Sequence, residues 1–289
     1  MLVHFTPLVA LLPTILACAD HSYSARSIVQ KRMKDSDILE SQWSTRNISS
    51  RDWAYEASYD WGRVNPDYEL CQTGTQQSPI NLRTAAVGNK VHTPVFTGYD
   101  GEWQGQYFNW GYGAAFNIDH PKGDYSQLPS MEYDNHTVYM TGWHIHAPAD
   151  HRIDGESPKA ELHFVHVDAK GKEKAVLGFM MDPAGDLEGT TYNSSWVDQL
   201  PTTMLHFGET HRQLAMPMRF DLALDEVKGF EEFWTYKGSL TSPPCTEGKR
   251  WFVARETMWT SVPQMREILR VSTFSARAVQ REWLHDLNL

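Results

Sequence analysis

The chain has 289 residues, of which 41% are hydrophobic and 21% are charged. This composition predicts a globular protein with a packed core and excludes a disordered or fibrous chain. The formal net charge of −10 argues against nucleic acid or an anionic membrane as a partner, because both would repel the chain.

The first 19 residues have the features of a secretory signal peptide. An apolar run from Phe5 to Ala17 ends in Ala17-Cys18-Ala19, which places small residues around a cleavage site after Ala19. The run is short for a bilayer span and contains two prolines, so a membrane anchor is disfavoured. We therefore expect a signal peptide over residues 1–19 and a secreted, extracellular protein.

The remaining chain divides by composition into two parts. Residues 20–50 are polar and charged, which predicts an N-terminal arm or a propeptide. The dibasic pair Lys31-Arg32 would suit propeptide cleavage, although an ordinary solvated arm explains it at least as well. Residues 51–289 have a uniform globular composition without repeats, which predicts one domain. The sequence carries no signal of oligomeric state.

Cysteines and glycosylation sequons fit an exported protein. Removal of the signal peptide leaves Cys71 and Cys245, an even number in an oxidising compartment. A bond between them would close a loop of 174 residues, worth about 5 kcal/mol in the chain-entropy model; the alternative is two buried free thiols. We expect one or two of three N-x-S/T sequons to be used, and these are Asn47, Asn135 and Asn193.

Short runs rich in β-branched and aromatic residues predict a mainly β domain. They cover residues 138–141, 143–146, 161–167, 175–180 and 249–254. A helix is predicted after Ser261, a candidate N-cap, because Met265, Ile268 and Leu269 follow at helical spacing. Many short strands with few helices indicate a large sheet with peripheral helices.

Three histidines form a candidate metal site. His144 and His146 lie two residues apart in a predicted strand, so both side chains point to the same face. His163 lies in the next predicted strand, which a short connection can bring beside the first. Three imidazoles with an open fourth position are typical of catalytic zinc, although copper or cobalt could use the same ligands. Spacing alone leaves hydrogen-bonded strand histidines as an equal alternative.

The second histidine strand also carries an acidic side chain on the predicted metal face. Glu161, His163 and Val165 alternate onto one face, whereas His166 points to the other. Glu161 can therefore accept a hydrogen bond from His163 and fix its tautomer, unless it is an exposed strand carboxylate. His166 and His151 are close in sequence but are not predicted as ligands. The sequence has neither the H-E-x-x-H helix of zinc proteases nor the G-x-S-x-G turn of serine hydrolases.

Three motifs, in this order, resemble those of α-class carbonic anhydrases, in particular secreted eukaryotic and fungal-like members. They are Gln77–Asn81 (QSPIN), the two histidine segments just described (His144-x-His146 and residues 160–163, AELH), and Tyr236–Pro244 (YKGSLTSPP). Trp53-Ala54-Tyr55 and residues 277–280 resemble the terminal motifs, so the resemblance spans about residues 53–280. It implies a single domain on a large twisted, mostly antiparallel sheet with short peripheral helices. The implied activity is that of a zinc lyase, which converts CO₂ reversibly to bicarbonate and a proton through a zinc-bound hydroxide.

The resemblance also assigns roles to individual residues. Thr241 would orient the hydroxide, and Asp150 would accept a hydrogen bond from Thr241. Cys71 and Cys245 match the disulfide of secreted members, and the Ser242–Pro243 step matches a cis-proline bond. The substrate pocket would be lined by Val165, Val176, Leu240, Ser242 and Trp251.

Three departures from the family pattern concern the surroundings of the metal. Asp150 replaces a glutamate that is one methylene longer, and Gly142 replaces a glutamine that supports the first ligand. The position of the proton-shuttle histidine corresponds to Ala114 or Tyr112, depending on the alignment. Tyrosine, with an ordinary pKa near 10, is a poor shuttle at neutral pH, so we expect proton transfer to limit turnover.

Two other functions are compatible with the resemblance. One is a catalytically weak carbonic-anhydrase-like binding protein, and the other is a zinc esterase of small esters. Proteins of the binding kind typically lack a zinc ligand, whereas this sequence has all three histidines and Thr241. A zinc lyase acting on CO₂ and bicarbonate is therefore the leading prediction.

Overall fold

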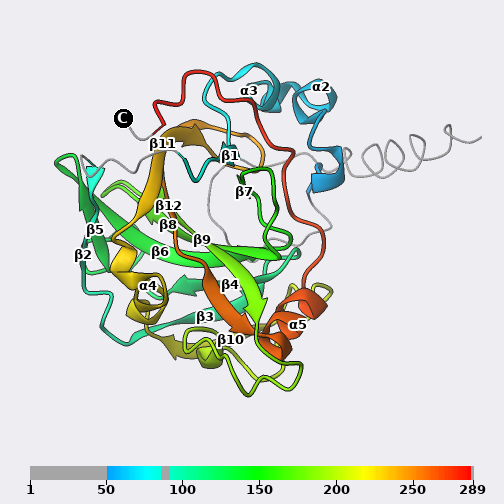
Figure 1. The fold of residues 1–289 in the computed structure, drawn as a ribbon. Coiled ribbons are helices and arrows are strands. Elements are labelled where there is room, and N and C mark those ends of the chain that lie inside the picture. Colours follow the sequence, from blue (N-terminus) through cyan, green and yellow to red (C-terminus); the bar gives the residue numbers. More distant parts are fainter. Residues whose placement is uncertain (1–50, 86–91, 288–289) are drawn as a thin grey trace, which may run out of the picture.

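The computed structural model describes residues 51–85 and 92–287 (Figure 1). The predicted signal peptide, the polar arm and the Asn47 sequon lie outside the described residues. The strands are β1 (Asn81–Leu82), β2 (Val95–Thr97), β3 (Trp103–Asn109), β4 (Ala114–Ile118), β5 (Ser130–Tyr133), β6 (His136–His146), β7 (Arg152–Ile153), β8 (Ala160–Val167), β9 (Glu173–Ala184), β10 (Gln213–Met218), β11 (Phe233–Ser239), β12 (Glu247–Ala254) and β13 (Met258–Ser261). The helices are short: α2 (Trp61–Val64), α3 (Leu70–Thr73), α4 (Asp221–Glu226), α5 (Val262–Val271) and the 3₁₀ turns η2 (Tyr55–Ala57), η3 (Pro66–Tyr68), η5 (Val197–Gln199) and η6 (Lys228–Phe230).

Eleven strands of the described region form one sheet, which confirms the predicted fold class. The strand order is β10-β3-β4-β6-β8-β9-β12-β11, with β5 on β6, β2 on β5 and β13 on β9. Pairing is antiparallel except where β9 meets β12 and β13. The two runs predicted at 138–141 and 143–146 belong to the single strand β6, whose pairing with β8 shifts register between Met140 and Gly142. A shift of this kind interrupts a ladder without ending the strand.

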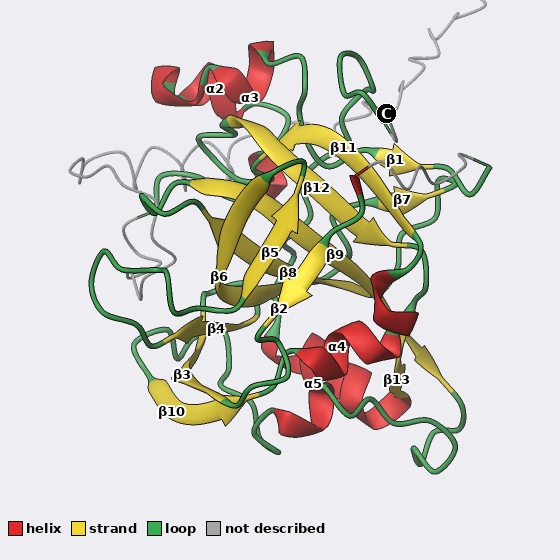
Figure 2. Ribbon diagram, turned by 90° about the vertical axis from the view of Figure 1, so that its left-hand side faces the viewer, coloured by secondary structure: helices red, strands yellow, loops and turns green. Residues whose placement is uncertain are grey.

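The helices lie at the two ends of the sheet. Figure 2 shows α2 and α3 at one end and α4 and α5 at the other. Helix α5 begins after Ser261 as predicted, because Ser261 and Gln264 form a capping box that satisfies backbone N–H groups at the helix start. Within the described ranges, every helix is too short or too polar to span a bilayer.

The central strands separate a large apolar core from the face that carries the histidines. All eight residues of β8 are buried. Leu162 and Phe164 point into the main hydrophobic core, where Phe179 and Trp196 also lie. The intervening side chains of β8 point to the opposite face, because strand side chains alternate. The polar residues of this strand are therefore buried by the fold.

Candidate metal centre

The register of β6 and β8 brings the three predicted ligands together. His144 pairs with His163 across the strands, and His146 lies two residues along β6 on the same face. One ligand atom from each histidine lies within 4.8 Å of the others. The three side chains are only 5%, 0% and 1% exposed, respectively for His144, His146 and His163, so protein surrounds the cluster.

The donor set and its spacing suit zinc. The Nε2 atoms of His144 and His146 are 3.0 Å apart. Two nitrogens bound tetrahedrally at the usual Zn–N distance are about 3.3 Å apart, so a small adjustment would bring both to one ion. Burial lowers the pKa of His144 well below its ordinary value and also lowers the pKa of His146. Both imidazoles are therefore neutral near pH 7, which is the state that binds a metal.

The nitrogens on the far side of two ligands are held by hydrogen bonds. His146 donates from Nδ1 to the carbonyl oxygen of Ser275 at 2.7 Å. His163 donates from Nε2 to Glu161 Oε1 at 2.8 Å. These bonds fix the tautomers and leave His146 Nε2 and His163 Nδ1 for the metal.

A buried chain of hydrogen bonds extends from Glu161 into the sequence motifs. His151 donates from its backbone N–H to Oε2 of Glu161 and from Nδ1 to Oε1. Tyr236 donates to Nε2 of His151 at 2.6 Å and contacts Ser78 Oγ at 2.9 Å. Although burial raises the pKa of Glu161, the attraction of His151 and His163 brings it well below its ordinary value. Glu161 is thus an ionised anchor for the third ligand.

Sequence reasoning missed this chain beyond Glu161. His151 was not predicted as a site residue, yet it is fully buried and contacts Glu161 directly. The available signal was that Ser78 and Tyr236 lie in two of the family motifs. Their roles depend on contacts between segments 158 residues apart, which spacing along one strand does not reveal.

Asp150 is buried beside the site but does not bond to Thr241. Its Oδ1 accepts the backbone N–H of Arg277 at 2.8 Å. Its Oδ2 lies 3.5 Å from Nδ1 of His146 and has no hydrogen-bond partner among the described residues. Among the described residues, no hydrogen bond joins Asp150 to Thr241. This agrees with an aspartate side chain that is one methylene shorter than the family glutamate.

The loop after β11 carries Thr241 and Ser242, both largely buried. Its fold corrects one expectation: the cis bond is Pro243–Pro244, not Ser242–Pro243. Both are X–Pro bonds with a small intrinsic cost for the cis form, so the sequence could not distinguish them.

The predicted apolar wall lies next to His163. Val165 pairs with Val176 on β9, and Val176 in turn pairs with Trp251 on β12. The Trp251 ring lies 4.9 Å from the ring of His163, and its Nε1 donates to Ser239 O at 3.0 Å. Trp251 therefore links the metal ligands to the start of the Thr241 loop. Leu240, within that loop, is half-buried.

Neither candidate shuttle position carries an imidazole or points freely to solvent. Ala114 is fully buried in the main core, whereas its neighbour Ala115 pairs with His144. Tyr112 is buried, with its ring 5.0 Å from Tyr55 and the Arg51 guanidinium 5.3 Å from its centroid. The structure places Tyr112 in an aromatic cluster close to the ligands.

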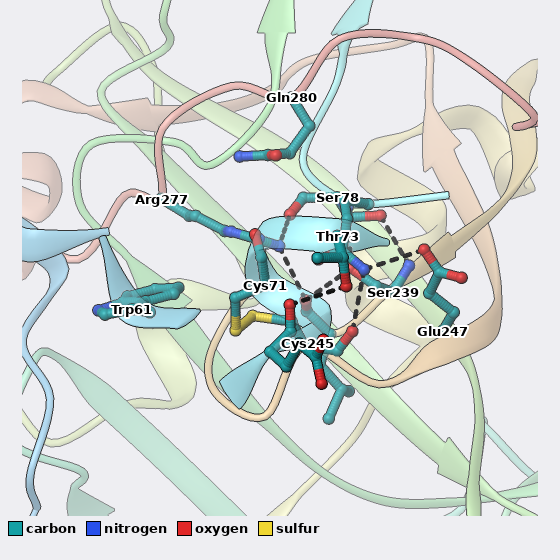
Figure 3. Close-up of a disulfide and its surroundings, with 12 residues drawn as sticks. Trp61, Cys71, Thr73, Ser78, Ser239, Cys245, Glu247, Arg277 and Gln280 are labelled. Carbon is teal, nitrogen blue, oxygen red and sulfur yellow. Dashed lines mark hydrogen bonds between the residues drawn. A yellow bond between two sulfur atoms is a disulfide. The ribbon is translucent and has the colours of Figure 1, made fainter. Parts of the chain in front are cut away.

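The disulfide fastens the Thr241 loop to the N-terminal helices. Cys71 on α3 is bonded to Cys245, directly after the proline pair (Figure 3). Beside it, Arg277 donates to the carbonyl oxygens of Ser78 and Cys71 at 2.7 and 2.9 Å. Ser78 N–H donates to Ser239 Oγ at 2.9 Å. Segments that are distant in sequence are thereby fixed around the loop.

Comparisons with known proteins agree with this geometry. The family described as eukaryotic-type carbonic anhydrase matches residues 56–286. A carbonic anhydrase of Pectobacterium atrosepticum is 29% identical over 237 residues, covering 81% of this chain and 88% of that protein. Alpha carbonic anhydrase 4 of Arabidopsis thaliana is 28% identical over 206 residues, covering 71% and 70%.

Solved structures share the fold. The α-carbonic anhydrase of Thermovibrio ammonificans, in complex with the inhibitor sulfanilamide, has a TM-score of 0.62 and 24% identity, covering 80% of this chain and 94% of that one. The fungal α-carbonic anhydrase of Aspergillus oryzae has a TM-score of 0.61 and 22% identity, covering 78% and 89%. The chain belongs to the eukaryotic-type carbonic anhydrase family, and its activity is the lyase reaction of that family, the reversible hydration of carbon dioxide.

Proposed function

We propose that the chain performs this reaction with a zinc ion held by His144, His146 and His163. The observation that carries the proposal is the convergence of three buried imidazole nitrogens within 4.8 Å, with two of the rings held by Ser275 and Glu161. When bound, zinc lowers the pKa of a water molecule to about 7, as is established for carbonic anhydrases, and so supplies a nucleophile near neutral pH.

The protein's own residues bind and orient the reactants. The hydroxyl of Thr241 would accept a hydrogen bond from the nucleophile and so orient it toward CO₂, while Ser242 would add a second hydroxyl. Val165, Val176, Leu240 and Trp251 provide an apolar surface for CO₂, which is weakly polar. The proximity of Trp251 to His163, and the pairing of Val176 with both Trp251 and Val165, support this assignment, because the substrate must lie beside the ligands to react.

Stopped-flow CO₂ hydration tests the proposal. We expect the zinc-loaded protein to hydrate CO₂. Chelation should lower the hydration rate to the uncatalysed rate in buffer, and return of zinc should restore it. His163→Ala should lower activity to the buffer rate while the protein stays folded by circular dichroism. Parallel assay of a small ester distinguishes the esterase alternative, and zinc-loaded wild-type protein without CO₂ hydration above buffer would refute the proposal.

We further propose that the protein is secreted and glycosylated. The apolar segment before Ala19 supports secretion, and the disulfide suits an oxidising compartment. Asn135 is the better-supported glycan site, because it lies exposed in the two-residue turn between β5 and β6. Asn193 is exposed too, but its amide already donates to Asp198. Expression in a secreting eukaryotic cell, with mass spectrometry of the wild-type protein and Asn135→Gln, tests both statements.

A further inference from the structure

His144 differs from the other two ligands in what surrounds it. Antiparallel pairing places Ala115 and His163 on either side of His144 in one row across the sheet. The adjacent row on the same face contains Asn117, Gly142 and Val165. Asn117 is therefore a diagonal neighbour of His144. Gly142, which lies beside Asn117 in its row and two residues before His144 on β6, has no side chain. Diagonal neighbours on a sheet lie within reach of an aromatic ring.

Close packing at Gly142 makes the absence of a side chain necessary. A Cβ at this position would lie 2.1 Å from the carbonyl oxygen of Phe116, so β4 would have to move. The same Cβ would lie 3.2 Å from Oδ1 of Asn117. The amide oxygen of Asn117 thus extends over Gly142, into the space that a side chain from residue 142 would otherwise enter.

A small cavity connects these groups. It has a volume of ≈ 10 Å³, room for about one water molecule, and its lining includes Asn117, Gly142, His144 and Val165. His144 directs Nε2 toward His146, so its Nδ1 is the nitrogen that a supporting acceptor would bind. The other two ligands obtain such acceptors from Ser275 and Glu161.

We propose that Asn117 is the positioning residue for His144, with its side-chain oxygen accepting the hydrogen bond of Nδ1–H. The inference rests on the proposed zinc site and adds the third acceptor to it. By holding the ring and its tautomer, Asn117 pre-orients Nε2 for the metal. Asn117 would take the place of the glutamine that the family pattern has at position 142, from the neighbouring strand. Loss of such a partner costs about 10- to 100-fold in metal affinity.

Zinc affinity, measured by competition with a chromophoric chelator, tests the role independently of catalysis. We expect Asn117→Ala to bind zinc about 10- to 100-fold more weakly than the wild type. Asn117→Asp keeps an acceptor oxygen in nearly the same place and should bind zinc at least as tightly as the wild type. Gln127→Ala, which removes an exposed amide from a loop, serves as the control and should leave affinity unchanged.

The pattern among the variants separates positioning from packing. Equal weakening in Asn117→Ala and Asn117→Asp, or unchanged affinity in both, would overturn the inference. Thermal unfolding of the metal-free proteins shows whether Asn117→Ala still folds, and Asn117→Asp tests the acceptor role if it does not. A wild-type protein that binds no zinc would instead refute the proposed function, so the two failures are distinguishable.

Discussion

Asp150 has a side chain one methylene shorter than the glutamate of the family pattern. Its carboxylate accepts from Arg277 and does not bond to Thr241 within the described chain, while a cavity of ≈ 220 Å³ lies beside it. Asp150→Glu adds one methylene and restores the length of the family glutamate, which would bring the carboxylate closer to Thr241. We expect kcat to rise about three- to tenfold, because a hydrogen bond to a charged group contributes about 1.5–3 kcal/mol and only part of it acts in the transition state.

Stopped-flow hydration at saturating CO₂ measures this gain. Asp150→Asn is the matched control, since it keeps the size of the side chain but removes the charge, and its kcat should fall. If Asp150→Glu had the same kcat as the wild type, the length of this side chain would not limit the enzyme.

At this scale the sequence predicted the ligands better than their supports. The two-residue period of strands, a local property, placed His144 and His146 on one face. The family motifs then decided between a metal site that includes His163 and ordinary hydrogen-bonded histidines. Ser275 and Asn117 could not be identified in this way, because their places beside the ligands arise from pairing and chain crossing. Glu161 was accessible because it shares a strand with His163.

At the scale of elements, the contact between β4 and β6 controls what position 142 accepts. Restoring the family glutamine with Gly142→Gln places a Cβ 2.1 Å from the Phe116 carbonyl oxygen. The strands would have to separate, so we expect a loss of several degrees in Tm, corresponding to about 1–3 kcal/mol for overpacking. Differential scanning calorimetry of the metal-free protein measures it, with Thr137→Gln on the exposed part of β6 as the control. Unchanged Tm in Gly142→Gln would show that β4 yields at little cost.

The elements themselves were predictable to different degrees. Helix α5 was found from its cap and apolar spacing, both of which are local signals. Strand order was not derivable from periodicity, because alternation shows which face a residue occupies but not which strand lies beside it. The family resemblance implied a large, mostly antiparallel sheet, and the structure supplied the order of its strands.

At the scale of the whole molecule, the disulfide between Cys71 and Cys245 closes a loop of 174 residues. The chain-entropy model assigns about 5 kcal/mol to such a loop, and strain in the folded state reduces the value. We expect the double variant Cys71→Ala/Cys245→Ala to lose about 3–5 kcal/mol in urea unfolding. The single variant Cys71→Ala, which leaves one thiol, should lose a similar amount. A loss below 1 kcal/mol would show that Arg277 and the neighbouring hydrogen bonds suffice to hold the Thr241 loop.

Proton release depends on the whole path from the site to solvent. Of the two positions that match the shuttle histidine of the family, Ala114 lies in the apolar core and Tyr112 in the aromatic cluster. His151, although close to the ligands, is fully buried and bonded to Glu161 and Tyr236. A general base needs a titratable side chain with a pKa near the working pH and an open route to water. Ala114 has no such side chain, and Tyr112 and His151 are buried, so none of the three is placed to pass a proton to bulk water.

A small soluble base should therefore take over the proton transfer for which Ala114, Tyr112 and His151 are poorly placed. We expect kcat at pH 7 to rise with imidazole concentration at constant ionic strength and then to level off when another step becomes limiting. A buffer of similar pKa but too large to approach the ligands is the control and should increase kcat less. Since chemistry at the metal precedes proton release, kcat/KM should stay constant while kcat rises. If kcat did not change with imidazole, proton transfer would have an efficient route through the protein, and Tyr112→Phe would then test whether that route passes through the tyrosine hydroxyl.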